Sequence, residues 1–255
     1  HSRFLAPDRL EHEQEILRRV GKNTDAQMRR GVLVIGTQVL EQSLDLDFDL
    51  LITDLCPMDL LLQRIGRLHR HTRIRPRGLE VPRCLVMGAL GELDAGSQAV
   101  YGDYLLLRTR RLLPERIRLP EDISPLVQRT YDAMRFPPES DEETGAAYAA
   151  YQYAQKRQKR KAKDYLLAQC DDYDSLVGMM DDIDQFTDLQ AQAAVRDGTA
   201  AVEVLVVQRS EDGMLLLSGE QKGMCLRADT QPSADEARWV AAQRLRLPSH
   251  FSARY

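Results

Sequence analysis

Short apolar runs separated by helical patterns are the feature that most restricts the fold of this chain. The runs lie at 31–36, 50–54 and 84–88, and each is bounded by glycine or polar residues. Unbroken apolar runs of this length are typical of parallel strands that are buried on both faces. Helical patterns precede and separate them, so the sequence predicts an α/β domain with a parallel sheet flanked by helices.

The helical pattern at 7–19 has recognisable ends. Asp8 and Glu11 have the spacing of a capping box, basic residues lie near the last turn, and Gly21 follows it. Another expectation concerns the strand ends. Ligands of parallel sheets gather beyond the carboxyl ends of strands, which is where Thr37 and Asp54 lie.

The stretch 63–70 reads Gln-Arg-Ile-Gly-Arg-Leu-His-Arg and is predicted to be helical. At about 100° per residue, Gln63, Arg67 and Arg70 share one face, opposite a group of aliphatic residues. Gly66 costs about 1 kcal/mol relative to alanine in a helix, and its missing side chain would let a ligand or another backbone come close. Two guanidiniums suit the spread charge of a transferring γ-phosphoryl group, so Arg67 and Arg70 are candidate arginine fingers. The plainer alternative is a solvated, arginine-rich helix.

A complete nucleotide site needs more than these arginines. The β- and γ-phosphates and magnesium are usually held by a Gly-rich loop that ends in Lys and Ser or Thr, with an acidic partner. The segment 21–23 contains Gly-Lys but lacks the hydroxyl residue and the earlier glycine. The chain therefore holds at most half of a nucleotide site. His69 and His71 lack carboxylate partners at ligand spacing in the sequence, so no metal site is predicted.

The pattern changes beyond residue 119, where prolines and an acidic patch at 139–143 predict a domain boundary. Residues 146–170 predict a long helix that carries a basic run at 156–163, with tyrosines before it. Such a helix is compatible with a nucleic-acid path or, equally, with a solvated linker. The aspartate-rich stretch 171–188 is interpreted as solvated surface.

The last part of the chain predicts a small α+β module. Residues 202–207 and 214–217 are expected to form a hairpin with an Asp-Gly turn between them. A helix capped by Ser233 and Glu236 is expected to continue through Arg246.

Length and composition limit the class of protein. With 255 residues, about two domains are expected, and the hydrophobic fraction of 43% and charged fraction of 29% are ordinary for a globular chain. No apolar run is long enough to span a membrane, so we expect a cytoplasmic protein. The 4 cysteines form no Cys-x-x-Cys, which indicates neither a zinc site nor a disulfide framework, and they are expected to be small buried hydrophobes. Because the chain opens with His1 rather than Met, we expect a piece of a longer protein.

Three segments resemble helicase motifs. Residues 37–45 and 63–71 are similar to motifs V and VI of the superfamily 2 helicases, and the opening His-Ser-Arg-Phe at 1–4 resembles motif IV. Their particular forms resemble those of one family, the CRISPR-associated helicase-nuclease of type I systems. Residues 195–217 resemble more weakly the start of that family's C-terminal domain. Ser43 departs from the general helicase pattern, in which a glycine is usual.

The resemblance implies an architecture and an activity. It implies a second RecA-like domain over 1–125, a linker over 126–195, and a C-terminal accessory domain over 196–255, which can continue past the last residue. It also implies an ATP-dependent translocase on single-stranded DNA, recruited by a CRISPR surveillance complex. ATP would be shared with the first RecA-like domain of the same protein, which would also bring magnesium, and a nuclease domain would be a further partner.

The resemblance also implies roles for individual residues, with Arg67 and Arg70 as the fingers. The positions that match the nucleotide side of the family's motifs are Gln63, Asp45, Arg67 and Arg70. Those that match its DNA side are Thr37, Ser2 and Arg3.

Two alternatives remain open at the level of the sequence. One is a non-catalytic module that binds nucleic acid or protein through its basic segments, and the other is the C-terminal half of a different superfamily 2 helicase or translocase. Because the Walker lysine, the Asp-Glu-x-His box and the His-Asp pair of the nuclease are missing from the sequence, this chain alone is expected neither to hydrolyse ATP nor to cut DNA.

Overall fold

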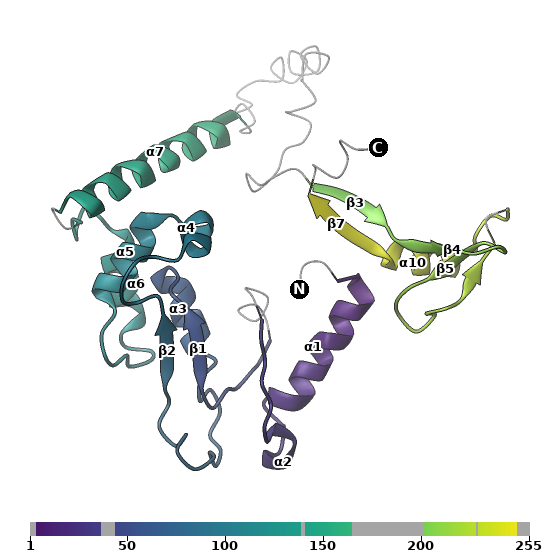
Figure 1. Ribbon diagram of the computed structural model, residues 1–255, viewed down its shortest axis with the longest axis horizontal. Helices are drawn as coiled ribbons and strands as arrows, with labels where there is room; N and C mark the ends of the chain where they lie inside the picture. Colours follow the sequence, from purple (N-terminus) through teal and green to yellow (C-terminus); the bar gives the residue numbers. More distant parts are fainter. Residues whose placement is uncertain (1–3, 37–43, 139–140, 165–200, 228, 249–255) are drawn as a thin grey trace, which may run out of the picture.

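Most of the chain is described by the computed structural model (Figure 1). The described residues are 4–36, 44–138, 141–164, 201–227 and 229–248. Thr37, Ser2, Arg3 and the acidic stretch 171–188 lie outside the described residues.

The first helix, α1 (Ala6–Val20), confirms the helix predicted at 7–19. Its predicted capping box is wrong, since the N-cap is Leu5 and no side chain caps the helix. Pro7 lies at the start, where a missing N–H costs nothing, and Asp8 lies in the first turn near the positive end of the helix dipole. Gly21 is the C-cap, and its N–H donates to the carbonyl of Leu17.

A parallel pair of strands forms the centre of the first half. β1 (Leu51–Asp54) and β2 (Cys84–Met87) pair in parallel, with Ile52 opposite Leu85, and the helix α3 (Met58–Ile65) lies between them in sequence. Both strands and their order agree with the predicted α/β class. A complete RecA-like sheet stays a prediction.

The predicted strand at 31–36 and the predicted burial of the strands on both faces are wrong for the described residues. Residues 31–36 are assigned to no strand; Val32 and Val34 pack on the cluster around Val20, while Ile35 is 88% exposed. Ile52 is likewise 57% exposed. Side chains along a strand point alternately to its two faces, and Ile52 shares an exposed face with Leu85, which lies opposite it.

Four further helices form one packed body with α3. Met58 and Leu62 of α3 form a buried cluster with Leu126. Tyr104 lies against both Tyr148 and Tyr151, with ring centroids 4.9 and 5.0 Å apart, which docks the long helix onto this body. The helices are α4 (Ala95–Tyr101), α5 (Asp103–Leu112), α6 (Ile123–Tyr131) and α7 (Glu142–Asp164).

The long helix α7 confirms the prediction at 146–170 as far as the described residues extend, and it begins earlier, at Glu142. α6 crosses residue 125, where the first domain was expected to end, and packs on α3 through the cluster that contains Leu126. The domain boundaries stay a prediction.

The described C-terminal residues, 201–227 and 229–248, form antiparallel strands and one helix (Figure 1). β4 pairs with β5 and β5 with β6, while β3 pairs with β7. The elements are β3 (Ala201–Leu205), β4 (Val207–Arg209), β5 (Met214–Leu216), β6 (Cys225–Leu226), α10 (Ala234–Ala242) and β7 (Arg244–Pro248). The short helix α2 (Ala26–Arg29) belongs to the first half of the chain.

The predicted hairpin is confirmed for its inner part only, because residues 201–205 pair with β7 instead of β5. At the turn, Gly213 has φ 152°, and a Cβ there would lie 2.1 Å from the carbonyl oxygen of Leu226. Only glycine fits such a position.

The helix expected to run through Arg246 ends at Ala242. Its capping box of Ser233 and Glu236 is confirmed. Beyond it, residues 244–247 alternate arginine and leucine, which is the period of a strand, and β3 offers Glu203 opposite Arg246. Tertiary pairing therefore overrides the helix expected there.

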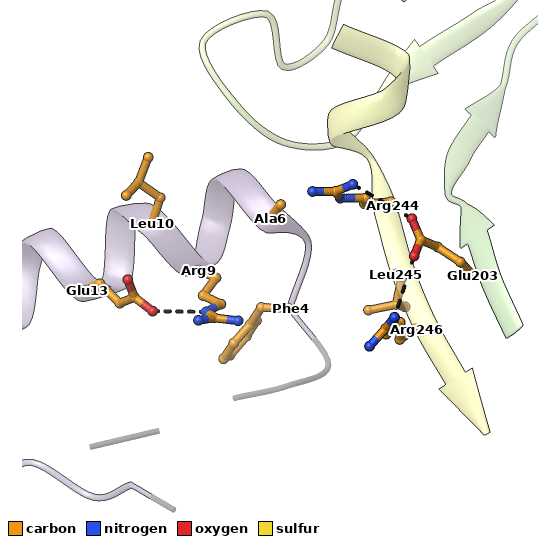
Figure 2. A pocket seen from close by; sticks show the side chains of 9 residues that line it. All are labelled: Phe4, Ala6, Arg9, Leu10, Glu13, Glu203, Arg244, Leu245 and Arg246. Atoms are coloured by element: carbon orange, nitrogen blue, oxygen red, sulfur yellow. Dashed lines mark hydrogen bonds and ion pairs between the residues drawn. The ribbon is translucent and has the colours of Figure 1, made fainter. Parts of the chain in front are cut away.

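A cleft lies between α1 and β7, and Figure 2 shows the side chains that line it. Arg9 pairs with Glu13 across one turn of α1, and Glu203 lies 3.8 Å from both Arg244 and Arg246. The charges that face this cleft are thus largely balanced.

None of the helices in the described part of the chain is both long and apolar enough to cross a membrane. The described cysteines differ in exposure: Cys56 is buried, Cys84 is half-buried and Cys225 is exposed. The expectation of small buried hydrophobes therefore holds for Cys56 and is wrong for Cys225.

Candidate nucleotide site around Arg67 and Arg70

The helix α3 ends at Ile65, so the predicted single helical face from Gln63 to Arg70 is wrong. Gln63 lies exposed on the helix, and both candidate fingers lie beyond it. Gly66 is the C-cap, and its N–H donates to the carbonyl of Leu62. A Cβ on Gly66 would touch only nearby carbonyl oxygens of the same helix, at 3.4 Å, so the expected close approach of another backbone is not found among the described residues.

The chain beyond α3 pairs with Phe48, which follows the segment 37–45. The N–H of Phe48 donates to the carbonyl of Arg67 (2.8 Å), and the N–H of His69 donates to the carbonyl of Phe48 (3.0 Å). These two hydrogen bonds make a parallel bridge between Phe48 and Leu68. His69 has φ 48°, a left-handed conformation that non-glycine residues seldom adopt. Residues 67–70 are therefore held by a turn and by backbone pairing rather than by a helix.

This pairing brings Arg67 and Arg70 together with Asp45. The Nε of Arg70 lies 2.7 Å from Oδ1 of Asp45, and Nε2 of His71 lies 3.0 Å from the same oxygen. Arg67 donates to the carbonyl oxygen of Leu44, next to Asp45 in sequence. Three of the four residues predicted on the nucleotide side therefore meet, although the helix that was expected to align them is absent.

The charges at this place influence one another. Burial raises the pKa of the Asp45 carboxyl, but the hydrogen bond from His71 and the charges of His71 and Arg70 outweigh it and hold that pKa below its ordinary value. Partial burial lowers the pKa of Arg67, the charge of Arg70 lowers it further, and Asp45 offsets part of this. A guanidinium keeps its proton in proteins at neutral pH, so Arg67 remains cationic despite this lowered pKa.

Beneath these residues lies a cluster that the sequence prediction missed. We call it the charged clasp, and it consists of Arg29, Asp47, Asp49, Arg73 and Arg75. The side chain of Asp47 is 0% exposed, Arg29 and Arg75 are 6% exposed, and Arg73 is 14% exposed. The alternation Asp-x-Asp-x-Asp at 45–49 and Arg-x-Arg at 73–75 was the available signal.

Among the residues that the structure describes, no group of three or more His, Cys, Asp or Glu side chains has a metal-binding arrangement. Asp54, expected near a ligand site, is exposed at the end of β1 and lines a small cavity with Asp94 and Ser97. The N–H of Ser97 donates to Asp94, the N-cap of α4, which uses that carboxylate in the fold.

Family models match both ends of the chain. Residues 1–73 match the model described as CRISPR-associated nuclease/helicase Cas3, C-terminal, and residues 196–255 match the Cas3 C-terminal domain. A curated relative, the CRISPR-associated nuclease/helicase Cas3 of Streptococcus thermophilus, is 42% identical over 268 residues, which cover 100% of this chain and 28% of the relative. The chain belongs to the Cas3 family. It corresponds to the C-terminal part of the family's proteins.

Solved structures agree with this assignment. The structure titled "Crystal structure of CRISPR-associated protein" is 31% identical, with a TM-score of 0.73, over 97% of this chain and 28% of the other. The T. fusca Cas3-AMPPNP structure is 28% identical, with a TM-score of 0.70 and the same coverage. The chain thus spans about three tenths of the length of the relatives it matches, so activities of those whole proteins come to it only as proposals.

The roles of the predicted site residues stay predictions. The structure groups Arg67, Arg70 and Asp45, and it places Gln63 on the neighbouring helix. Thr37, Ser2 and Arg3 lie outside the described residues. His71 is the addition, since it contacts the same carboxylate as Arg70 and was considered in the sequence only as a metal ligand.

Proposed function

We propose that this chain is the C-terminal helicase part of an ATP-dependent Cas3 enzyme and supplies the arginine side of its nucleotide site. The observation that carries the proposal is the meeting of Arg67, Arg70 and Asp45 at the junction of two backbone-paired segments. Family membership and the name of the AMPPNP structure support a nucleotide as the ligand. The rest of the site would come from another domain of the longer protein.

The proposed chemistry is electrostatic. A guanidinium cannot lose its proton at working pH, so Arg67 and Arg70 would stabilise negative charge that develops on the transferring phosphoryl group. Asp45 and His71 would orient Arg70 until a nucleotide brought by the other domain competes for it. Gln63, exposed on α3, would contact the same nucleotide. Magnesium would be held by the other domain.

The remaining parts of the proposal rest on the family. Thr37, Ser2 and Arg3 would contact the backbone of single-stranded DNA, with movement driven by closure of two RecA-like domains over ATP. The nuclease domain would belong to the same protein, and a CRISPR surveillance complex would recruit it. The cytoplasmic location expected from the sequence is part of this proposal.

The decisive experiment uses the full-length protein. Arg67→Ala and Arg70→Ala should each lower DNA-stimulated ATP turnover by about 10³- to 10⁵-fold, the range known for arginine fingers, while DNA affinity is largely kept. Arg118→Ala is the matched control, because Arg118 pairs with Asp122 on the exposed surface, apart from the site. Unchanged turnover in both finger variants would overturn the proposal.

The alternative of a purely binding module predicts different results. Basic clusters that only contact phosphates give binding with a steep salt dependence, and substitutions in either cluster cause similar losses. Substituting Arg67 and the exposed Lys156 of α7 separately in the same protein distinguishes the two. Equal losses of DNA affinity with no ATPase to lose would favour the binding module.

A further inference from the structure

Asp47 is a charged residue in a place that few charges occupy. Its side chain is 0% exposed, whereas the side chain of Asp45, two residues earlier, is 46% exposed. A buried carboxylate is tolerated only when cations and hydrogen-bond donors surround it. The groups around Asp47 therefore show what holds it there.

Two arginines from the loop after the candidate fingers face Asp47. The Nε of Arg73 lies 2.5 Å from Oδ2, and Nη2 of Arg75 lies 3.1 Å from Oδ1 and 3.2 Å from Oδ2. The loop that the sequence shows as basic thus turns these two guanidiniums inward. They are engaged in holding the fold and are not presented to a nucleic acid.

The clasp also closes on itself. Arg75 donates to Asp49 at 2.7 Å and to the carbonyl of His71 at 2.6 Å, while Arg29 lies 3.3 Å from Asp49. Its guanidiniums outnumber its carboxylates, and backbone carbonyls take the surplus donors. Arg73 donates to those of Gly21, Lys22 and Thr24, and Arg29 donates to that of Asp47.

The contact that matters for the site is with the main chain of a finger. Oδ1 of Asp47 accepts a hydrogen bond from the backbone N–H of Arg70 at 3.0 Å. The neighbouring bonds, between Phe48 and the backbone of Arg67 and His69, fix the other side of the same turn. His69 is held between these bonds in its left-handed conformation, which non-glycine residues seldom adopt.

We propose that Asp47 is a positioning residue: with Arg73 and Arg75 it fixes the backbone of Arg70 and thereby sets where the guanidinium of Arg70 reaches. This inference rests on the proposed function, since it assigns Asp47 to the same nucleotide site. Asp47 itself is buried and does not touch the nucleotide. Its effect passes through Arg70.

The test uses Asp47→Asn in the full-length protein, since asparagine keeps the shape and removes the charge. A displacement of about 1 Å at reacting groups can cost on the order of 10²-fold in rate, so we expect kcat for ATP to fall by about 10- to 100-fold. The KM for ATP and the DNA affinity should change by less than about threefold, because Asp47 makes no contact with either ligand.

A matched control exists within the chain. Asp122 also accepts from a backbone N–H, that of Arg118 at 2.7 Å, and pairs with the same residue's guanidinium at 3.0 Å. Asp122→Asn removes the same kind of interaction at a distance from the site. It should leave kcat unchanged.

A double variant separates positioning from general damage. If Asp47 acts through Arg70, Asp47→Asn should lower kcat in the parent protein but have little further effect in the Arg70→Ala protein. Equal factors in both backgrounds would overturn the inference while leaving the proposed function intact. Unchanged turnover in Arg70→Ala itself would instead remove the proposed function.

A second substitution keeps the test available if Asp47→Asn does not fold. Arg73→Lys retains the positive charge and loses the forked contacts to three carbonyl groups. Its fall in kcat should be smaller and should also vanish in the Arg70→Ala protein. A fall in kcat that persists there would count against positioning.

Discussion

Two buried polar centres hold different parts of this molecule, and they do so with different chemistry. In the first half, the charged clasp ties the segment 45–49 to the loop at 73–75 and to α2. In the C-terminal part, the amide of Gln243, 1% exposed, joins the end of α10 to residues 217–218 without any charge. Because one centre is charged and the other neutral, the two regions should differ in how much stability the loss of one residue costs.

The Gln243 contacts satisfy both ends of one amide. Its Oε1 accepts from the N–H of Leu217 at 3.0 Å, and its Nε2 donates to the carbonyls of Ser218 at 3.0 Å and Trp239 at 3.3 Å. We call these contacts the Gln243 bridge. Burying a neutral amide costs less desolvation free energy than burying charges does. In the charged clasp, the loss of one member leaves the charge of its partner buried and uncompensated.

The largest expected effect is on the clasp. Arg75→Leu leaves Asp47 and Asp49 with fewer cations in a buried place, and removing one partner of a buried pair costs about 3–5 kcal/mol. Hydrogen exchange of the full-length protein should show lost protection in 44–50 and 67–72. Arg118→Leu is the control, since the Arg118 side chain is 73% exposed. A loss of protection no larger than in the Arg118→Leu protein would contradict the proposed difference between the charged clasp and the Gln243 bridge.

A smaller effect is expected at the bridge. Gln243→Ala leaves the N–H of Leu217 and the carbonyl of Ser218 without their partner, at a cost of about 1–3 kcal/mol. The same exchange experiment should show faster exchange in 215–218 and 239–246 and no change in 44–50. Changes that spread to 44–50 would mean that the two centres are one cooperative unit.

The smallest expected difference between the charged clasp and the Gln243 bridge is their response to acid. Burial raises the pKa of Asp49, but the hydrogen bond from Arg75 and the charges of Arg29 and Arg75 outweigh it, so its folded pKa lies below the ordinary value of 3.8. The stability contributed by Asp49 is therefore complete above the unfolded pKa and is lost as pH falls through the folded one. Protection of 44–50, corrected for intrinsic rates, should decline below about pH 4.

The variant Asp49→Asn gives the control for acid. Since it cannot titrate, its protection at 44–50 should depend less on pH, although it is lower throughout. Protection around Gln243 should stay level over the same interval. Parallel declines in both regions would show that acid acts on the whole fold rather than on the clasp.

Sequence patterns predicted the elements whose signal is local. The helix at 7–19, the parallel strands β1 and β2, and the capping box of Ser233 and Glu236 needed only spacing and terminal residues. The pattern failed where tertiary pairing decides. Residues 244–248 became a strand because β3 lies beside them, and residues 67–70 left the helix because Phe48 pairs with them.

The sequence pointed to residues that meet at the candidate site, but it did not predict the backbone pairing that brings them together. The resemblance to helicase motifs pointed to Arg67, Arg70 and Asp45, whereas the helical face that was expected to align the two arginines is wrong. The charged clasp was missed because nothing local in the sequence shows that Arg73 and Arg75 face a buried carboxylate. Arg75 lies 26 and 28 positions from Asp49 and Asp47, the two carboxylates that it contacts. A pattern read over a short stretch of sequence does not reach residues so far apart.

The early end of α3 has a consequence for how this region can change. On a helix, inserting one residue would rotate every later side chain by about 100° and remove the arginines from their common face. Here the chain beyond Gly66 is registered against Phe48 by backbone bonds, so the side chain at Leu68 can vary while the spacing cannot. If this segment is transplanted into another protein, the number of residues between Gly66 and Arg70 must therefore be kept.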